Sequence, residues 1–416
     1  MSTMPIAEVT NTAPQQASAV AGEQYNTGSP LLVCLPWVTA DSLQNMRTRV
    51  ATAFPERAAL IAVAENSGAA SQAQASDNIR MVDYPATSRG QVGWALTAND
   101  YLGASQLALE HGAAATLVLG AEAVSLSTEA LQRLAEAVLR GEADLAIPRY
   151  TMGPQDALVS SALLYPLTRA LFGISVHLPL PLDAAFSTRM AKRIAAINRP
   201  ANTTASEPLL WTVAEAATTL LTVREIDAGK RTLPRPVDID LNSLLTEVTG
   251  SLFSDIELKA SFWQRARATV PAKPATQSVH STAESGQLED IREMAEAFRN
   301  AYTNLQDIWS LVLPPQSLLG LKKVSRVPAE DFEVPPDLWA RTVYDFVLAY
   351  HLRTINRGHL LGALTPLYLA WVASHLRRSA GDDALAASHV EETAAAFVTE
   401  KPYIVARWRW PDRFNP

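Results

Sequence analysis

Residues 30–119 alternate between short apolar runs and longer segments with helical periodicity, and this alternation constrains the fold more than any other feature. The first run, residues 30–36 (PLLVCLP), is almost continuously apolar, which is typical of a parallel strand covered on both faces. Strands that alternate with helices predict a doubly wound α/β sheet. The expected strands are residues 30–36, 58–64, 79–82 and 116–119, and the expected helices are residues 40–54 and 92–111.

A carboxylate follows the strand predicted at residues 116–119. Glu122 stands just past the end of that strand, and Ser127 opens a helix that continues to about residue 140. Ligands of open α/β sheets bind beyond the carboxyl ends of the strands, so Glu122 is a candidate ligand-binding residue. A solvated loop carboxylate is the alternative. The sequence lacks G-x-G-x-x-G after the first strand and lacks G-x-x-x-x-G-K-[ST] throughout, so neither of these phosphate-binding motifs is present.

The later part of the chain becomes helical. Residues 268–286 are rich in Pro, Ser, Thr and Ala and predict a linker, whereas residues 1–29 predict a disordered leader rather than a signal peptide. We therefore expect an α/β domain at residues 30–267 and an all-helical domain at residues 287–416. The remaining expected elements are strands at 143–148 and 222–227, an extended segment at 176–183, helices at 158–172, 184–197, 207–221, 241–267, 288–312, 336–357, 359–378 and 384–401, and a basic aromatic tail at 407–410 that packs on the protein or touches a membrane surface.

Charge and cysteine content narrow the function. The formal net charge is -7 and no Lys/Arg-rich run occurs, which argues against nucleic acid as a partner. Cys34 is the single cysteine, so the chain forms no internal disulfide, as expected in a reducing cytoplasm. The apolar residues 360–376 contain Pro366 and fall short of the ~20 residues of a membrane span. We expect a cytoplasmic protein without a transmembrane segment, whose helical part offers a surface for homo-oligomer formation.

Four stretches, in this order, resemble family-2-type glycosyltransferases of the GT-A fold, and in particular glucosyl- and mannosylglycerate synthase-like enzymes. The resemblance implies a GT-A-like mixed sheet flanked by helices, followed by an all-helical C-terminal domain. It also implies a nucleotide-sugar donor, a small glycerate-like hydroxyl acceptor and transfer with retention of configuration. The stretches are LLVCLPWVTADSLQNMRTRV, EALQRLAEAVLRGEADLAIPRYTMGPQD, LLYPLTRALFGISVHLPLPLDAAFS and WARTVYDFVLAYHLRTINRGHLLGALTPLYLAWVASHL.

The chain departs from the family pattern where the family binds metal and diphosphate. The family's metal-binding Asp-x-Asp corresponds to Gly120-Ala121-Glu122, so one carboxylate is missing, and a single carboxylate binds Mg²⁺ or Mn²⁺ weakly. Metal dependence is therefore expected to be weakened or absent. Three further motifs differ: Arg231 and Thr232 stand where the family has a metal-binding histidine, Pro181-Leu182 replaces Gly-Gly before the retained Asp183, and Glu65-Asn66-Ser67-Gly68 replaces the nucleotide-binding Asp-Gly.

The resemblance assigns a role to individual residues, each of which also has a structural explanation. Asp183 and Glu207 are the candidate catalytic acids, although Asp183 also suits a helix N-cap and Glu207 a first-turn acid. Arg89 replaces a family lysine, and its guanidinium suits a diphosphate. Each of the basic residues can instead be a surface charge. The candidate nucleotide-sugar-binding residues are Pro36, Glu65, Asn66, Arg89, Glu122, Arg149, Lys230 and Arg231, with Glu122 also the candidate metal ligand.

These residues support two interpretations. In the first, the chain transfers a sugar from a nucleotide-diphosphate donor to a small hydroxyl acceptor, and basic residues supply part of the charge that a metal supplies elsewhere. In the second, the same departures mark a catalytically degenerate relative that binds a nucleotide-sugar or acts as a partner protein. A sugar nucleotidyltransferase is disfavoured because Leu35-Pro36-Trp37-Val38 stands where a glycine-rich, basic loop is expected.

Overall fold

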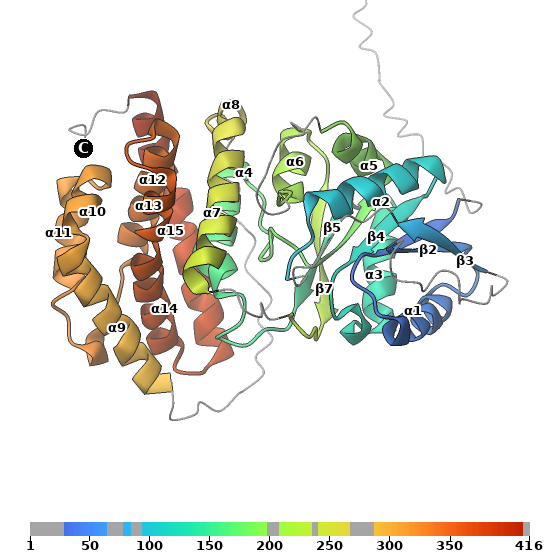
Figure 1. The fold of residues 1–416 in the computed structure, drawn as a ribbon, viewed down its shortest axis with the longest axis horizontal. Helices are drawn as coiled ribbons and strands as arrows, with labels where there is room; N and C mark the ends of the chain where they lie inside the picture. Colours follow the sequence, from blue (N-terminus) through green and yellow to red (C-terminus); the bar gives the residue numbers. More distant parts are fainter. Residues whose placement is uncertain are drawn as a thin grey trace, which may run out of the picture.

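The structure is a computed structural model that describes residues 29–64, 78–84, 94–197, 208–234, 240–266 and 287–410. Figure 1 shows an α/β region on one side and a helical region on the other, with α7 and α4 between them. A mixed sheet flanked by helices and followed by helices confirms the fold class predicted from the sequence.

The α/β region is built on a seven-stranded sheet with the order β3-β2-β1-β4-β6-β5-β7. Every neighbouring pair is parallel except the two that involve β6, which runs antiparallel between β4 and β5. All five residues of β1 and of β4 are buried, which explains why Thr116 is the one polar side chain in these two strands. The strands are β1 (Leu31–Leu35), β2 (Ala59–Ala64), β3 (Ile79–Tyr84), β4 (Ala115–Leu119), β5 (Leu145–Tyr150), β6 (Asp183–Ser187) and β7 (Val223–Gly229).

Helices cover both faces of this sheet. The apolar residues of α1 (Ala40–Ala53) and α3 (Thr128–Leu139) pack on one face, and those of α2 (Ala98–Glu110), α5 (Thr188–Ala195) and α6 (Thr212–Thr218) pack on the other. Helix α2 begins later than predicted, because Thr97 and Asp100 form a capping box at its start.

The strand β6 was not predicted. Residues 184–197 were expected to be helical, but Asp183–Ser187 pairs with β4 and β5, and the helix starts at Thr188 with Ser187 as its N-cap. The interpretation of Asp183 as a helix N-cap is therefore wrong. Asp183 opens a central strand and pairs with Leu119, the last residue of β4. This pairing places its carboxylate at the carboxyl end of β4.

The helical region shares one apolar core with two earlier stretches of the chain, residues 160–172 and residues 241–258. The π-helical turn η4 (Ser160–Leu164), helix α4 (Tyr165–Phe172) and helix α7 (Leu241–Leu258) contribute residues to the same core as the C-terminal helices. None of the helices in the described ranges is long and apolar enough to cross a membrane. The remaining helices are α8 (Ala260–Trp263), α9 (Gln287–Asn304), α10 (Gln306–Val312), α11 (Pro315–Val324), α12 (Pro336–Leu352), α13 (Arg357–Gly362), α14 (Thr365–Ser379) and α15 (Asp383–Arg409), with short 3₁₀ turns η3 (Ala123–Ser125) and η5 (Ala329–Asp331).

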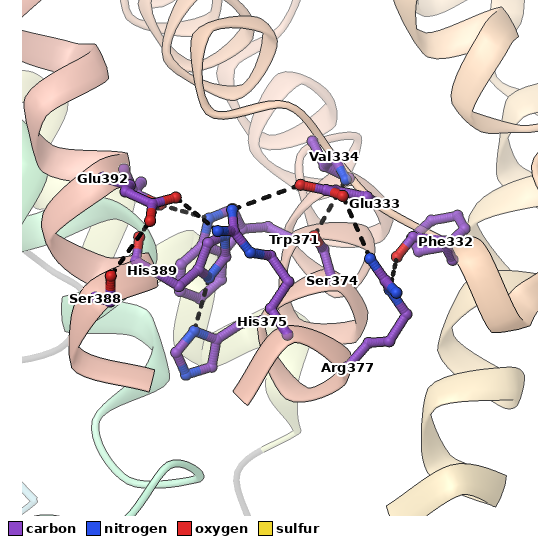
Figure 2. Close-up of polar contacts among 12 residues, drawn as sticks. Phe332, Glu333, Val334, Trp371, Ser374, His375, Arg377, Ser388, His389 and Glu392 are labelled. Carbon is purple, nitrogen blue, oxygen red and sulfur yellow. Dashed lines mark hydrogen bonds and ion pairs between the residues drawn. The ribbon is translucent and has the colours of Figure 1, made fainter. Parts of the chain in front are cut away.

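The predicted basic aromatic tail is the end of α15 rather than a separate segment. Arg407 is buried and its guanidinium forms an ion pair with Asp345 of α12, while Trp408 packs edge-on against Trp263. Packing on the protein, one of the two interpretations made from the sequence, is therefore correct for these residues. Polar contacts also join α14, α15 and the segment before α12, including ion pairs of Arg378 with Glu333 and Glu392 (Figure 2).

Candidate functional site

The Asp183 carboxylate lies at the junction of β4, β5 and β6 and accepts hydrogen bonds from two of its neighbours there. The backbone N–H of Gly120 donates to Oδ1 at 2.9 Å, and the phenol of Tyr150 donates to Oδ2 at 2.5 Å. The Asp183 side chain is fully buried. Burial and the neighbouring carboxylate raise the pKa of Tyr150 well above its usual value, so this phenol stays protonated and remains a donor.

Arg231 follows β7 and inserts its guanidinium beside the same carboxylate. Its Nε lies 2.8 Å from Asp183 Oδ2, its Nη2 lies 3.2 Å from Oδ1, and neither side chain is exposed. Burial disfavours the charged guanidinium, but the charge of Asp183 and its hydrogen bonds outweigh that effect and raise the pKa of Arg231. Asp183 and Arg231 therefore form a buried, bidentate ion pair, whose charge-assisted hydrogen bonds are stronger than those between neutral groups.

The guanidinium also binds the turn that follows β4. Nη2 donates to the carbonyl of Ala121 at 2.6 Å, and Nη1 donates to the carbonyl of Glu122 and to Ser125 Oγ, the latter at 2.9 Å. A guanidinium has five N–H donors. Here Nε, Nη1 and Nη2 are all engaged within the chain. The complete set of acceptors is Asp183 Oδ1 and Oδ2, the carbonyls of Ala121, Glu122 and Thr232, and Ser125 Oγ.

Gly120 and Leu182 approach each other too closely for a side chain at residue 120. The Gly120 N–H donates to the Leu182 carbonyl at 2.9 Å, and a Cβ added to Gly120 would lie 2.6 Å from that oxygen. Real Cβ atoms essentially never come this near, so a residue with a side chain requires the backbone to move. Gly120 therefore has no room for a side chain, whichever residue stands at position 182, because the contact is with the backbone carbonyl.

A small cavity lies next to this ion pair, at the carboxyl ends of β1 and β4. Its volume is about 100 Å³, and residues of the loop after β1, of α1 and of the turn after β4 line it. The indole N–H of Trp37 is buried there and has no hydrogen-bond partner in the part of the chain that the structure describes. Glu122 stands at the rim with an exposed side chain and a left-handed backbone (φ 60°), a conformation that costs energy for residues other than glycine.

The structure brings together three of the residues selected from the sequence, namely Glu122, Asp183 and Arg231. Pro36 is buried at the end of β1, whereas Lys230 is exposed beside Arg231. Arg149 lies on β5, partly exposed, 4.0 Å from Glu225. Glu65, Asn66, Arg89 and Glu207 lie outside the described residues.

Four participants were not selected from the sequence: Gly120 as a donor, Tyr150, Ser125 and Trp37. Tyr150 was available as a signal, because it directly follows the candidate Arg149 at the end of a strand. The others act through a backbone N–H, a turn hydroxyl and an indole N–H, and their role depends on strand pairing that the sequence does not display.

The residues of this site do not fit a divalent metal. Hard cations such as Mg²⁺ and Mn²⁺ need several free oxygen ligands. Both oxygens of Asp183 are engaged by Arg231, Tyr150 and Gly120, and Gly120 has no room for a second carboxylate. Among the described residues, no group of three or more His, Cys, Asp or Glu side chains is placed to hold a metal ion.

No protein-family model matches this sequence, and no curated protein matches it. The structure is similar to glucosyl-3-phosphoglycerate synthase from Mycobacterium tuberculosis in complex with phosphoglyceric acid, with 11% identity over 61% of this chain and 85% of that chain and a TM-score of 0.38. The complex of that enzyme with Mn²⁺, UDP and glucosyl-3-phosphoglycerate gives 13% identity, 62% and 86% coverage and a TM-score of 0.37.

A third similar structure is a CMP:2-keto-3-deoxy-manno-octonic acid synthetase complexed with CTP. It is 9% identical over 55% of this chain and 100% of that chain, with a TM-score of 0.33. The neighbours are thus GT-A and related nucleotide-sugar enzymes, the class that the sequence motifs resemble. At these identities the likeness concerns the fold.

Proposed function

We propose that this chain is a degenerate glycosyltransferase that binds a nucleotide or nucleotide-sugar and does not carry out metal-dependent glycosyl transfer. One observation carries the proposal: Asp183, the retained acid of the acceptor loop, is fully buried and both of its oxygens are engaged within the chain. A general base must reach the proton that it removes. A carboxylate held by a guanidinium, a phenol and a backbone amide lacks a free position for an acceptor hydroxyl.

The cavity beside the ion pair, at about 100 Å³, has room for one group of a ligand rather than for a whole nucleotide-sugar, since small-molecule sites span about 300–1,000 Å³. It lies where open α/β sheets take their ligands, and it presents a buried indole N–H of Trp37 that lacks a partner among the described residues. Leaving a buried donor unpaired costs about 1–3 kcal/mol, which a ligand acceptor would recover. The exposed Glu122 carboxylate at the rim can accept hydrogen bonds from hydroxyl groups, such as those of a ribose or a sugar.

The test is calorimetric titration of the purified chain with UDP-glucose and GDP-mannose, in Mn²⁺ and then in EDTA. We expect equal affinity under both conditions and no release of nucleotide diphosphate with glycerate or phosphoglycerate as acceptor. Trp37→Phe removes the indole N–H together with part of the ring and is expected to weaken binding by at least about five- to tenfold, the equivalent of one neutral hydrogen bond. Trp410→Phe is the matched control, because Trp410 is 72% exposed.

A second candidate is metal-independent transfer, favoured by the exposed, strained Glu122. Turnover that persists in EDTA and is abolished in Glu122→Gln would support this candidate over the degenerate one. Binding that requires Mn²⁺ would contradict both.

Localisation in the cytoplasm, assembly through the helical region and the boundaries at residues 267 and 287 stay predictions. Light scattering of the full chain tests the assembly.

A further inference from the structure

We infer that Arg231 is the resident cation of this site: its guanidinium occupies the oxygen-lined position beside Asp183 and leaves no place for a divalent metal. The inference deepens the proposed function by naming what has replaced the metal. It rests on geometry and not on nucleotide binding.

Oxygen atoms surround the Arg231 guanidinium. All six acceptors around it are oxygen atoms, and they come from the carboxylate of Asp183, three backbone carbonyls and one hydroxyl. These oxygens surround the planar guanidinium and accept from Nε, Nη1 and Nη2, so the positive charge is bound on every side by oxygen. The fold therefore contains a cation-binding position, and the Arg231 side chain occupies it.

Gly120, Asp183 and Arg231 together limit which charges this position can hold. A carboxylate at residue 120 would lie against the Leu182 carbonyl, because even a Cβ there would come within 2.6 Å of it. Asp183 would be a buried, unpaired charge without Arg231, and such a charge is costly. Gly120 and Arg231 therefore act on the same position: Gly120 leaves no room for a second acid, and Arg231 supplies the charge that pairs with Asp183.

Arg231 also orders the turn that carries Glu122. The guanidinium binds the carbonyls of Ala121 and Glu122 and the hydroxyl of Ser125, so it fixes the residues on both sides of the left-handed Glu122. A metal bound by side-chain carboxylates would not tether these carbonyls. The cation of this site therefore acts as a structural anchor for the rim of the cavity.

The test compares wild type, Arg231→Ala and Asp183→Asn/Arg231→Ala by thermal unfolding of the nucleotide-free chain, with 1 mM MnCl₂, with 1 mM CaCl₂ and with EDTA. Wild type should unfold at the same temperature in all three. Arg231→Ala should unfold at a clearly lower temperature, and Mn²⁺ or Ca²⁺ should restore part of the loss, because the emptied position is lined by oxygens. The double variant should show no such restoration. Lys230→Ala is the matched control, because it removes the adjacent exposed cation, and it should behave as wild type.

A second measurement covers the case in which Arg231→Ala does not fold. Arg231→Met should be less stable than Asp183→Asn/Arg231→Met, because only the single variant leaves an unpaired buried charge. Equal stability of these two would contradict the inference, as would Mn²⁺ stabilisation of wild type that Asp183→Asn abolishes. Absence of nucleotide binding would contradict the proposed function alone, since no nucleotide enters these measurements.

Discussion

The Nδ1 atoms of His375 and His389 lie 2.9 Å apart between α14 and α15, and the surrounding contacts fix the tautomers of both rings (Figure 2). His375 Nε2 lies 3.2 Å from the carbonyl of Pro154, which can only accept, so Nε2 carries the hydrogen and Nδ1 is bare. His389 Nδ1 must then donate. Its Nε2 is left as a buried acceptor without a partner among the described residues.

This pair predicts a loss of stability in acid. Burial lowers the pKa of His375 to about 4 and of His389 to about 3, the latter with a further contribution from His375. Both values lie below the ordinary 6.5, so the stabilisation is complete above pH 6.5 and declines as the pH falls towards 4. The expected loss is about 1.4 kcal/mol for each pH unit and each histidine that stays neutral. Urea unfolding at pH 7.5, 6 and 5 measures it. The decline should be shallower in His389→Gln; an unchanged slope would contradict the assignment.

His177 predicts the opposite dependence at alkaline pH. Its ring lies between Glu225 of β7 and Glu391 of α15, with nitrogen–oxygen distances of 3.0 and 3.3 Å. Burial disfavours the charged ring, but hydrogen bonds to both carboxylates prevail and raise the pKa to about 9. The stabilisation is therefore complete below pH 6.5 and is lost as the pH rises through 9, with a total of about 1–3 kcal/mol.

The measurement is the midpoint of thermal unfolding between pH 6 and pH 9.5. His177→Gln should flatten the alkaline part of the profile, whereas the same replacement at the exposed His359 should leave it unchanged. Identical profiles for wild type and His177→Gln would show that this ring does not bind both carboxylates in its charged form.

The left-handed backbone of Glu122 predicts that glycine is tolerated there better than alanine. Its φ of 60° is strained for any residue with a Cβ. Glu122→Gly should be more stable than Glu122→Ala by about 0.5–1 kcal/mol, because both variants lose the carboxylate and only alanine keeps the strain. Chemical denaturation of the two variants measures the difference. A less stable glycine variant would mean that the turn is not left-handed in solution.

Replacement of Arg407 should cause a large loss of stability, although the sequence places this residue in a basic aromatic tail. Its guanidinium pairs with the buried Asp345, which also accepts from Tyr403 at 2.8 Å. Arg407→Met should destabilise the chain by about 3–5 kcal/mol, because a buried carboxylate is left without its cation. Arg409→Met, two residues further on and exposed, should change stability by no more than about 0.5 kcal/mol. Equal effects would contradict the buried pair.

Apolar runs made most of the sheet predictable. β1, β2 and β4 are continuous runs because strands covered on both faces need no polar side chains. β6 was not predictable in the same way. Its residues, DAAFS, include two alanines, which favour helix, and its strand conformation comes from pairing with β4 and β5.

Three residues of the candidate site were predictable from the sequence, but its other members and its contacts were not. Sequence motifs selected Glu122, Asp183 and Arg231, and the structure places all three together. The contact that defines the site joins Asp183 to a residue 48 positions later in the chain, and the steric conflict joins Gly120 to Leu182. The first follows from the placement of β6 and β7 on either side of β5, and the second from the pairing of β4 with β6; no local sequence pattern reveals either.

The shared core of η4, α4, α7 and the C-terminal helices has a consequence for dissection of the chain. Trp339 donates its indole N–H to the carbonyl of Ala162 at 2.8 Å, and the buried Lys401 donates to the carbonyl of Leu171 at 3.2 Å. A fragment that ends at the linker would lose these partners and expose the apolar side of α4. Such a fragment should aggregate when it is expressed by itself. The two halves, supplied as separate polypeptides, should associate into one complex.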